Sequence, residues 1–252
     1  MNIVIPGSPH WLEIIRPILS AHDAVPVTQI DSTNLIAVLA DLNAALLLID
    51  GELSDWRTWA VTPRTSPAVR RIPIVVITDD AATADSARRF NVDRIVSAAE
   101  LPSVLPNLLT TLARRITAEQ SEALKQGCAE PLPPEALEAI ERFNRGDYYK
   151  QHDLFEALWM QETRPIRDLY RAVLQVGIAY YQIEQGNWRG AHKMLLRSIQ
   201  WLVPLPDHCQ GIDLGALKAD AAAVRAELER VGRDNLAAFD RSLLKPIRYT
   251  VD

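Results

Sequence analysis

A histidine, a glutamate and a tryptophan, whose side chains can do chemistry, lie at helical spacing in the stretch GDYYKQHDLFEALWMQE, residues 146–162. His152 and Glu156 are four residues apart, and Trp159 follows three residues later. Because an α-helix turns once in 3.6 residues, these side chains share one face, and Tyr148 falls on that face as well. The stripe is rich in aromatic residues, so we expect it to be buried against neighbouring helices.

A buried histidine and a buried carboxylate need partners, since uncompensated burial of polar groups is costly. Three hypotheses follow. His152 and Glu156 form a structural network, bonded to each other or to Gln175 or Tyr180; they are two ligands of a divalent metal; or Glu156 orients His152 as a general base. The catalytic residue therefore stays open, with His152 and Glu156 as the candidates for both catalysis and metal binding.

A metal site would need more than these two groups, because catalytic zinc takes three protein ligands and keeps one position open. No third ligand has a diagnostic spacing from the pair. The candidates are His192, Asp153, Asp168, Glu184, His208 and Cys209.

Two basic stripes lie near the motif in the sequence. Each is either a solvated helix face, which is the preferred interpretation, or part of a surface for an anion or an acidic partner. The stripes are Arg164, Arg167 and Arg171, and Arg189, Lys193 and Arg197.

The chain around the motif shows only helical periodicity from residue 134 to 232, which predicts an all-α bundle. Asp147, Asn187 and Asp213 are candidate N-caps of three of its helices. Residues 117–133 are expected to be a linker, and 233–252 a C-terminal tail. The expected helices cover 133–146, 148–162, 166–185, 188–202 and 214–231.

Residues 1–116 have a different pattern, in which short apolar runs alternate with helical stretches. Two of the runs, 44–50 and 72–78, are unbroken, as in strands buried on both faces. A helix is expected over 33–42, with Ser32 as its cap. The pattern predicts a doubly wound α/β domain with a five-stranded parallel sheet. The five expected strands are 2–5, 24–30, 44–50, 72–78 and 93–97.

The order of these elements resembles the receiver domain of response regulators, including its flavodoxin-like topology. The resemblance places the phosphoacceptor position on Asp50, in LLLIDGEL, and the switch hydroxyl on Thr78, in IVVIT. Receivers hold a divalent cation with an acidic pair after the first strand, but the segment 6–8 here is Pro-Gly-Ser. The lysine expected after the fifth strand is also absent, since Ser97 and Ala98 stand there. We therefore expect a pseudo-receiver in which Asp50 and Thr78 are inactive.

The C-terminal half resembles the helical family known as domain of unknown function 309. The carrying motifs are F-N-x-G-x-Y followed by H-x-x-x-E-x-x-W, a glutamine in RAVLQVGIAYY (Gln175), and GNWRGA, all within 134–203. The resemblance implies a site around His152 and Glu156 that has been suggested to bind metal, with no reaction assigned. Asp153 stands where family members often have glutamate, and Gln182 stands where many have histidine.

Bulk properties limit the classes of function. The net charge of −5 and the isoelectric point of about 5.6 argue against a general nucleic-acid binder. No apolar run approaches the ~18 residues of a membrane span, and the N-terminus does not have the pattern of a signal peptide. The cysteines, Cys128 and Cys209, form no C-x-x-C pair, so we expect neither a zinc ribbon nor a disulfide framework.

The sequence thus predicts a cytoplasmic, homo-oligomeric signalling or regulatory protein. Its degenerate receiver would bind a protein partner or a second copy of itself, and its helical domain would carry a pocket of Tyr148, His152, Glu156, Trp159 and Gln175. The alternative is a metal-dependent, hydrolase-like enzyme that uses His152 and Glu156 and is regulated by the receiver-like domain. No cofactor is certain, and a divalent metal is the candidate.

Overall fold

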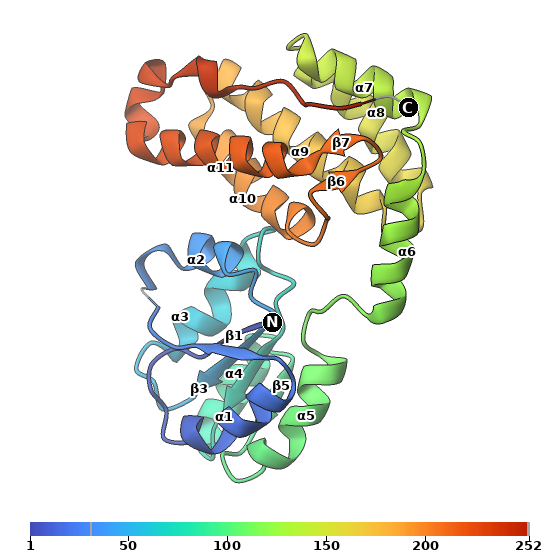
Figure 1. The fold of residues 1–252 in the computed structure, drawn as a ribbon. Helices are drawn as coiled ribbons and strands as arrows, with labels where there is room; N and C mark the ends of the chain where they lie inside the picture. The colour runs from blue at the N-terminus through green and yellow to red at the C-terminus, as the bar shows by residue number, and fades with distance from the viewer. Residues whose placement is uncertain (31, 251–252) are drawn as a thin grey trace. The chain divides into compact units, whose positions relative to one another are not determined.

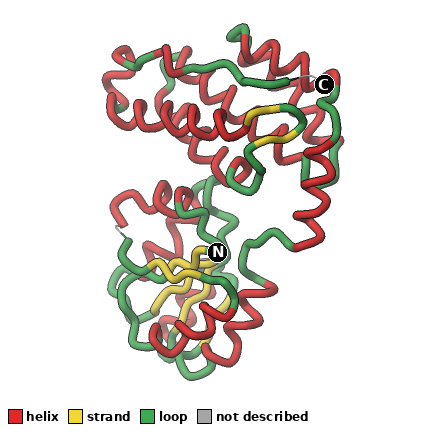
Figure 2. The backbone as a smooth tube through the Cα atoms, in the orientation of Figure 1, coloured by secondary structure: helices red, strands yellow, loops and turns green. Residues whose placement is uncertain are grey.

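A computed structural model describes residues 1–30 and 32–250 of the chain. The described chain forms two compact units, Met1–Arg115 and Ile116–Asp252 (Figure 1). The first unit is an α/β domain and the second is helical, as the sequence predicts (Figure 2).

The α/β unit contains a five-stranded, all-parallel sheet with the order β2-β1-β3-β4-β5. This is the doubly wound order that receivers and flavodoxin share, so the predicted fold of this half is confirmed. The strands are β1 (Asn2–Val4), β2 (Val25–Val27), β3 (Leu46–Asp50), β4 (Ile74–Ile77) and β5 (Arg94–Val96). The helices are α1 (Leu12–Ala21), α2 (Leu35–Asp41), α3 (Trp56–Val61), α4 (Ala81–Arg89) and α5 (Leu101–Thr111), with 3-10 turns η1 (Ser32–Asn34) and η2 (Thr62–Thr65).

The unbroken apolar runs become the central strands because helices cover both faces of the sheet. Leu46 and Leu48 pack with Ile15 of α1 and Leu105 of α5 in one core. The alternate residue Leu47 is also fully buried, which places it against the opposite covered face. In register, Asp50 of β3 lies beside Ile77 of β4, at the carboxyl edge of the sheet.

The helical unit is built from α6 (Ala118–Ala129), α7 (Pro134–Asn144), α8 (Tyr148–Gln161), α9 (Arg167–Glu184), α10 (Trp188–Leu202) and α11 (Leu214–Val231). A short antiparallel hairpin, β6 (His208–Cys209) and β7 (Ile212–Asp213), precedes α11. The caps Asn187 and Asp213 are confirmed, since their side chains accept bonds from Gly190 N and Ala216 N. Asp147 occupies its N-cap position without a side-chain cap bond.

Helix α9 is the central element of this unit, with α8 and α10 packed against it. Gln151 of α8 is fully buried at the contact with α9, and its Nε2 donates to the carbonyl oxygens of Tyr148 and Leu174. Gly177 makes that approach feasible, because a Cβ there would lie 2.4 Å from Gln151 Nε2. The glycine therefore sets how closely α8 and α9 pack.

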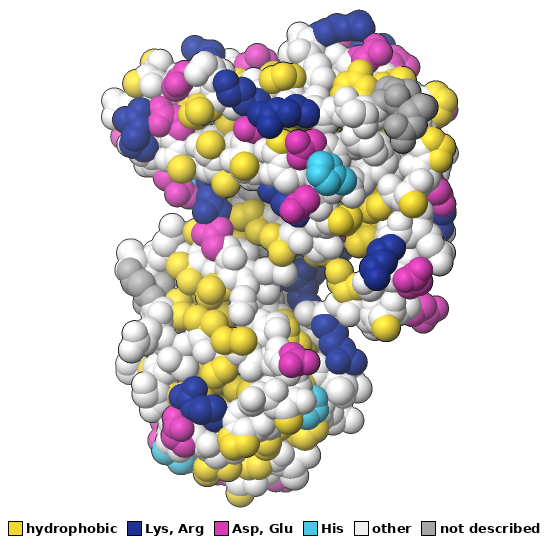
Figure 3. All heavy atoms as spheres, viewed as in Figure 1, with side chains coloured by type: hydrophobic (Ala, Val, Ile, Leu, Met, Phe, Trp, Pro, Cys, Tyr) yellow, Lys and Arg dark blue, Asp and Glu magenta, His cyan; other side chains and the backbone are white. Residues whose placement is uncertain are grey.

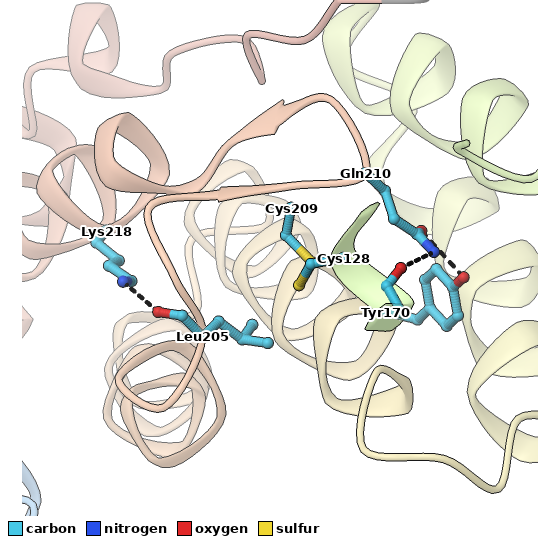
Figure 4. Close-up of a disulfide and its surroundings, with 7 residues drawn as sticks. Cys128, Tyr170, Leu205, Cys209, Gln210 and Lys218 are labelled. Carbon is cyan, nitrogen blue, oxygen red and sulfur yellow. Dashed lines mark hydrogen bonds between the residues drawn. A yellow bond between two sulfur atoms is a disulfide. The ribbon is translucent and has the colours of Figure 1, made fainter. Parts of the chain in front are cut away.

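Residues 117–133 contain helix α6, which begins with a capping box between Thr117 and Gln120. Near its end, Cys128 forms a disulfide with Cys209 of β6 (Figure 4). The expectation of no disulfide is therefore wrong. The spacing of 81 residues gave no local signal, and only the fold brings the two Cα atoms to 4.3 Å.

Residues 233–250 run along the helical unit through 3-10 turns η3 (Arg233–Ala238) and η4 (Arg241–Leu243). Phe239 and Ile247 are buried in the helical core. The side chain of Asn144 accepts from Ile247 N at 2.7 Å and donates to Ile247 O at 2.9 Å. Residues 251–252 of the expected tail and the Ser32 cap side chain lie outside what the structure describes.

Candidate functional site

The site residues of the sequence motif meet at a cleft formed by α8, α9 and α10, here called the α8–α10 cleft. Its volume is about 170 Å³. Four of the five predicted pocket residues do lie near one another, and Tyr148 is the exception. The lining residues are His152, Glu156, Trp159, Arg171, Leu174, Gln175, Ile178, Met194 and Arg197.

The antiparallel register of the three helices orders these side chains along the cleft. Trp159, Arg171 and Trp201 meet at one end, as their ring contacts show. The same register brings Glu156 of α8 level with Gln175 of α9, about 5 Å, or one helical turn, along the cleft from Trp159 and Arg171. His152 follows on α8 after a further turn. The cleft thus has a cationic, aromatic end and a carboxylate and amide in its middle.

His152 and Glu156 share the cleft but do not bond each other. The Nδ1 atom of His152 lies 3.2 Å from Asp153 Oδ1. Within the described residues, Glu156 makes no hydrogen bond or ion pair. The described side chains show no hydrogen bond from either residue to Gln175 or Tyr180. His152, Glu156 and Trp159 are half-buried because the cleft opens along them, whereas Tyr148 is buried. If His152 acts as a general base, the carboxylate that orients it in this structure is that of Asp153 and not that of Glu156.

Arginine side chains of α9 cover the tryptophan of the motif. The guanidinium carbon of Arg171 lies 4.5 Å from the Trp159 ring centre and 3.8 Å from that of Trp201. Arg167 lies 5.6 Å from the Trp159 ring centre. Cation–π contacts of this kind fix the position of the guanidinium. Arg171 and Arg197 are thus half-buried on the cleft wall rather than on a solvated face, which corrects the preferred interpretation of the stripes for these two residues.

The other basic residues have different surroundings. Arg164 forms ion pairs with Glu130 and Glu162 at 2.5 and 2.7 Å. Its hydrogen bonds hold the pKa of Glu162 down to about 2. Arg189 and Lys193 are exposed on α10. The two stripes therefore do not form one continuous anion surface, and only their cleft members point to a ligand.

Gln175 is buried on the cleft wall, and its Oε1 finds no donor among the residues that the structure describes. The same holds for the buried Nε1 of Trp159. Unpaired buried polar atoms are unfavourable, so each marks a place where a ligand or a small side-chain rotation would be stabilising. Sequence reasoning missed Leu174, Ile178 and Met194, which supply the apolar wall; their helical spacing resembles that of ordinary core residues.

Tyr148 lies away from the cleft, in an aromatic cluster with Phe143 and Tyr180. Burial, with a smaller contribution from Glu184, raises the pKa of Tyr148 to about 12. Burial also raises the pKa of Tyr180, whose hydroxyl has no partner within the described chain. Tyr148 therefore supports the helix packing behind the motif.

The candidate third metal ligands are dispersed. His192 Nε2 lies 2.9 Å from Glu229 Oε1 and its ring stacks on Trp188. His208 is exposed in β6, and Cys209 is in the disulfide. Over residues 1–30 and 32–250, no group of three or more His, Cys, Asp or Glu side chains has the arrangement of a metal site. Gln182 bonds Asn187 instead of facing the cleft.

In the α/β unit, Asp50 and Thr78 end neighbouring strands β3 and β4. Asp50 Oδ1 accepts a bond from Glu52 N, and Thr78 Oγ1 accepts one from Asp80 N. The loop after β1 contains Pro6, Gly7 and Ser8 at the positions where a receiver has its acidic pair. The loop after β1 thus lacks the acidic pair that would hold a cation beside Asp50.

Charged side chains of both signs are interspersed on the visible face of the helical unit, without a large field of one sign (Figure 3). No helix of the described residues is long and apolar enough to cross a membrane.

Comparisons with known proteins match each half separately. The family described as Domain of unknown function (DUF309) matches residues 136–194, which confirms the resemblance stated for the helical half. A protein of Aquifex aeolicus (strain VF5), itself described as uncharacterized, is 28% identical over 83 residues. That match covers 32% of this chain and 25% of the relative, so it spans about a quarter of the relative's length.

Two solved structures of the RcsB response regulator are similar at low TM-scores. One, from Salmonella typhimurium and described for its conformational dynamism for DNA interaction, is 22% identical with a TM-score of 0.35; the similarity covers 52% of this chain and 78% of that one. The other, from Salmonella enterica serovar Typhimurium, is bound to promoter rprA in the presence of the phosphomimetic BeF3⁻. It is 25% identical with a TM-score of 0.36, and the similarity covers 57% of this chain and 83% of that one. The receiver-like assignment of the α/β unit rests on its strand order.

Proposed function

We propose that this chain is a regulatory protein whose helical unit binds a small ligand in the α8–α10 cleft. The single observation that carries the proposal is that Glu156, Arg171 and Gln175 line one cleft, in which the buried Gln175 Oε1 and Trp159 Nε1 have no partner among the described residues. Binding sites commonly combine an apolar wall with a few convergent polar groups. The cleft has both, whereas the loop after β1 adds no carboxylate beside Asp50 at the carboxyl edge of the sheet.

In this proposal the receiver-like unit is a docking module for a protein partner or for a second copy of the chain. Its fold is that of a receiver, but Pro6, Gly7 and Ser8 cannot replace the carboxylates that hold a cation for phosphoryl transfer. We expect the protein to act as a homo-oligomer, with its output set by the ligand rather than by phosphorylation of Asp50.

A screen by thermal unfolding tests the ligand-binding claim. Small metabolites and divalent cations are added one at a time to the full chain, and the melting temperature is recorded for the wild type and for Glu156→Gln. We expect at least one metabolite to raise the melting temperature of the wild type and to do so less in the variant, because a ligand that binds only the folded state stabilises it. The proposal fails if no compound has this effect.

The second candidate is a metal-dependent enzyme, which the shared position of His152 and Glu156 on the cleft favours. Protein purified without an affinity tag would then contain stoichiometric zinc, iron or manganese by elemental analysis. His152→Ala would remove that metal. A metal-free wild type that gains no melting temperature from any of these ions would contradict this candidate.

A further inference from the structure

The α8–α10 cleft carries fixed charges of opposite sign. The carboxylate of Glu156 projects from α8, and the guanidinium groups of Arg171 and Arg197 belong to α9 and α10. We propose, building on the proposed function, that the cleft binds a small zwitterion: an α-amino acid with an apolar side chain. Its carboxylate would contact Arg171, and its ammonium group would contact Glu156.

Arg171 is suited to hold a carboxylate at a fixed place. Its guanidinium lies over the rings of Trp159 and Trp201, at 4.5 and 3.8 Å from their centres. Ring contacts use the face of a guanidinium, whereas a carboxylate is bound at its edge by two parallel N–H bonds. The indole Nε1 of Trp159 is a further donor, buried and without an acceptor among the described side chains. The aromatic end of the cleft therefore matches an anionic group.

Glu156 and Gln175 are suited to hold an ammonium group. Both offer oxygen acceptors, Gln175 Oε1 is buried and has no donor within the described part of the chain, and Glu156 is half-buried. The register places them about one helical turn, roughly 5 Å, from Arg171 along the helix axes. A molecule with its two charges a few bonds apart can therefore bridge the acceptors and the arginine. An inorganic anion would contact the arginines without using the acceptors of Glu156 and Gln175, and a metal ion would be repelled by the arginines.

The remaining lining fits an aliphatic side chain. Leu174, Ile178 and Met194 form an apolar wall next to the polar groups. The cleft volume of about 170 Å³ is similar to that of cavities of ~150 Å³ that hold one benzene-sized molecule. This volume must hold the whole ligand, so we expect an amino acid with a short side chain, such as valine, leucine, isoleucine or methionine.

Isothermal titration calorimetry on the full chain tests the proposal. The probes are L-valine, L-leucine, L-isoleucine and L-methionine, with isopentylamine and 4-methylpentanoate as analogues of leucine that lack one charge each. Inorganic phosphate and Zn²⁺ are the remaining probes. We expect at least one amino acid to bind, and we expect each single-charge analogue to bind at least tenfold more weakly than leucine.

Two variants with the same chemical change locate the site. Glu156→Gln keeps the shape of the side chain and removes its charge, so affinity for the amino acid should fall about ten- to a hundredfold. Glu184→Gln makes the same change at an exposed position of α9 outside the cleft, and affinity should stay within twofold. Circular dichroism confirms that both variants are folded before titration.

The other outcomes are decisive as well. If 4-methylpentanoate or phosphate binds as tightly as leucine, the proposal of a zwitterionic ligand is wrong, while the proposal that the cleft binds a ligand is retained. If Zn²⁺ alone binds, the zwitterion is wrong and the metal-dependent candidate gains support. If the amino acids bind and Glu156→Gln has no effect, the site is elsewhere. If nothing binds here or in the metabolite screen, the proposed function fails together with this inference.

Discussion

The guanidinium carbon of Arg171 lies 4.5 Å from the centre of the Trp159 ring, and this contact joins α8 to α9 at the cationic end of the α8–α10 cleft. The contact connects Trp159 of the sequence motif to α9, a separate helix that begins at Arg167. In the same register of α8 and α9, Glu156 lies level with Gln175. The motif is thus one wall of a site whose other walls are α9 and α10.

A double-mutant cycle measures this contact. Arg171→Met and Trp159→Leu each remove one partner while keeping an apolar side chain. We expect a coupling of about 0.5–2 kcal/mol in the free energy of unfolding, since cation–π pairs reach the upper value when partly desolvated. Urea denaturation of the two single variants and the double variant gives the coupling. Strictly additive effects would show that the contact is not energetically significant.

Tyr180 and Tyr170 give a matched test of hydroxyl pairing. Tyr180 is fully buried and its hydroxyl finds no partner among described residues, whereas the Tyr170 hydroxyl donates to Gln210 Oε1 at 3.1 Å (Figure 4). Tyr180→Phe should leave the free energy of unfolding unchanged or raise it by up to about 1 kcal/mol. Tyr170→Phe should lower it by about 1 kcal/mol, because Gln210 loses its donor. Equal losses in both variants would contradict the pairing described.

The buried tyrosines predict a loss of stability in alkali. The pKa of Tyr148 is raised to about 12 in the folded protein, against about 10 in an unfolded chain. Between these values the folded state holds more protons than the unfolded state, so stability falls as pH rises from about 10 to 12. Tyr148→Phe should reduce that slope in denaturation curves measured across this range. Tyr149→Phe, at a residue 58% exposed, is the control and should keep the wild-type slope.

The disulfide between Cys128 and Cys209 should stabilise the helical unit strongly. It closes a loop of 81 residues, and chain entropy assigns about 4.5 kcal/mol to a crosslink of that length. Cys128→Ala with Cys209→Ala should lower the free energy of unfolding by about 2–5 kcal/mol, and dithiothreitol should lower it similarly in the wild type. The double variant, which is insensitive to dithiothreitol by design, controls for effects of the reagent. No loss of stability in either case would mean that the bridge does not form in solution.

The elements that could be predicted from the sequence are those whose periodicity is strong over many residues. The runs 44–50 and 72–78 predict buried strands because both faces of the sheet are covered, and β3 and β4 lie within them. Helix α6 is polar on most faces and was expected to be a linker, although the capping box at Thr117 and Gln120 signals a helix start. The polar composition of this segment favoured a linker, whereas its capping residues indicate the start of a helix.

The site could be predicted in part, because helical spacing fixes which residues share a face of one helix. It places His152, Glu156 and Trp159 on one face of α8, and all three line the α8–α10 cleft. It cannot fix the register between helices, so it assigned Tyr148 to the pocket and missed Arg171 as the partner of Trp159. It also missed the buried Gln151, whose place depends on Gly177 of another helix.

Hydrogen exchange followed by mass spectrometry tests most directly whether the α8–α10 cleft is the ligand site. The full chain is labelled with and without a saturating concentration of the amino acid that binds most tightly. We predict that the largest added protection falls on peptides from Tyr148–Gln161 and Arg167–Glu184, and that Glu156→Gln removes it at the same concentration. Protection centred in Met1–Arg115, or none in α8 and α9, would contradict the account.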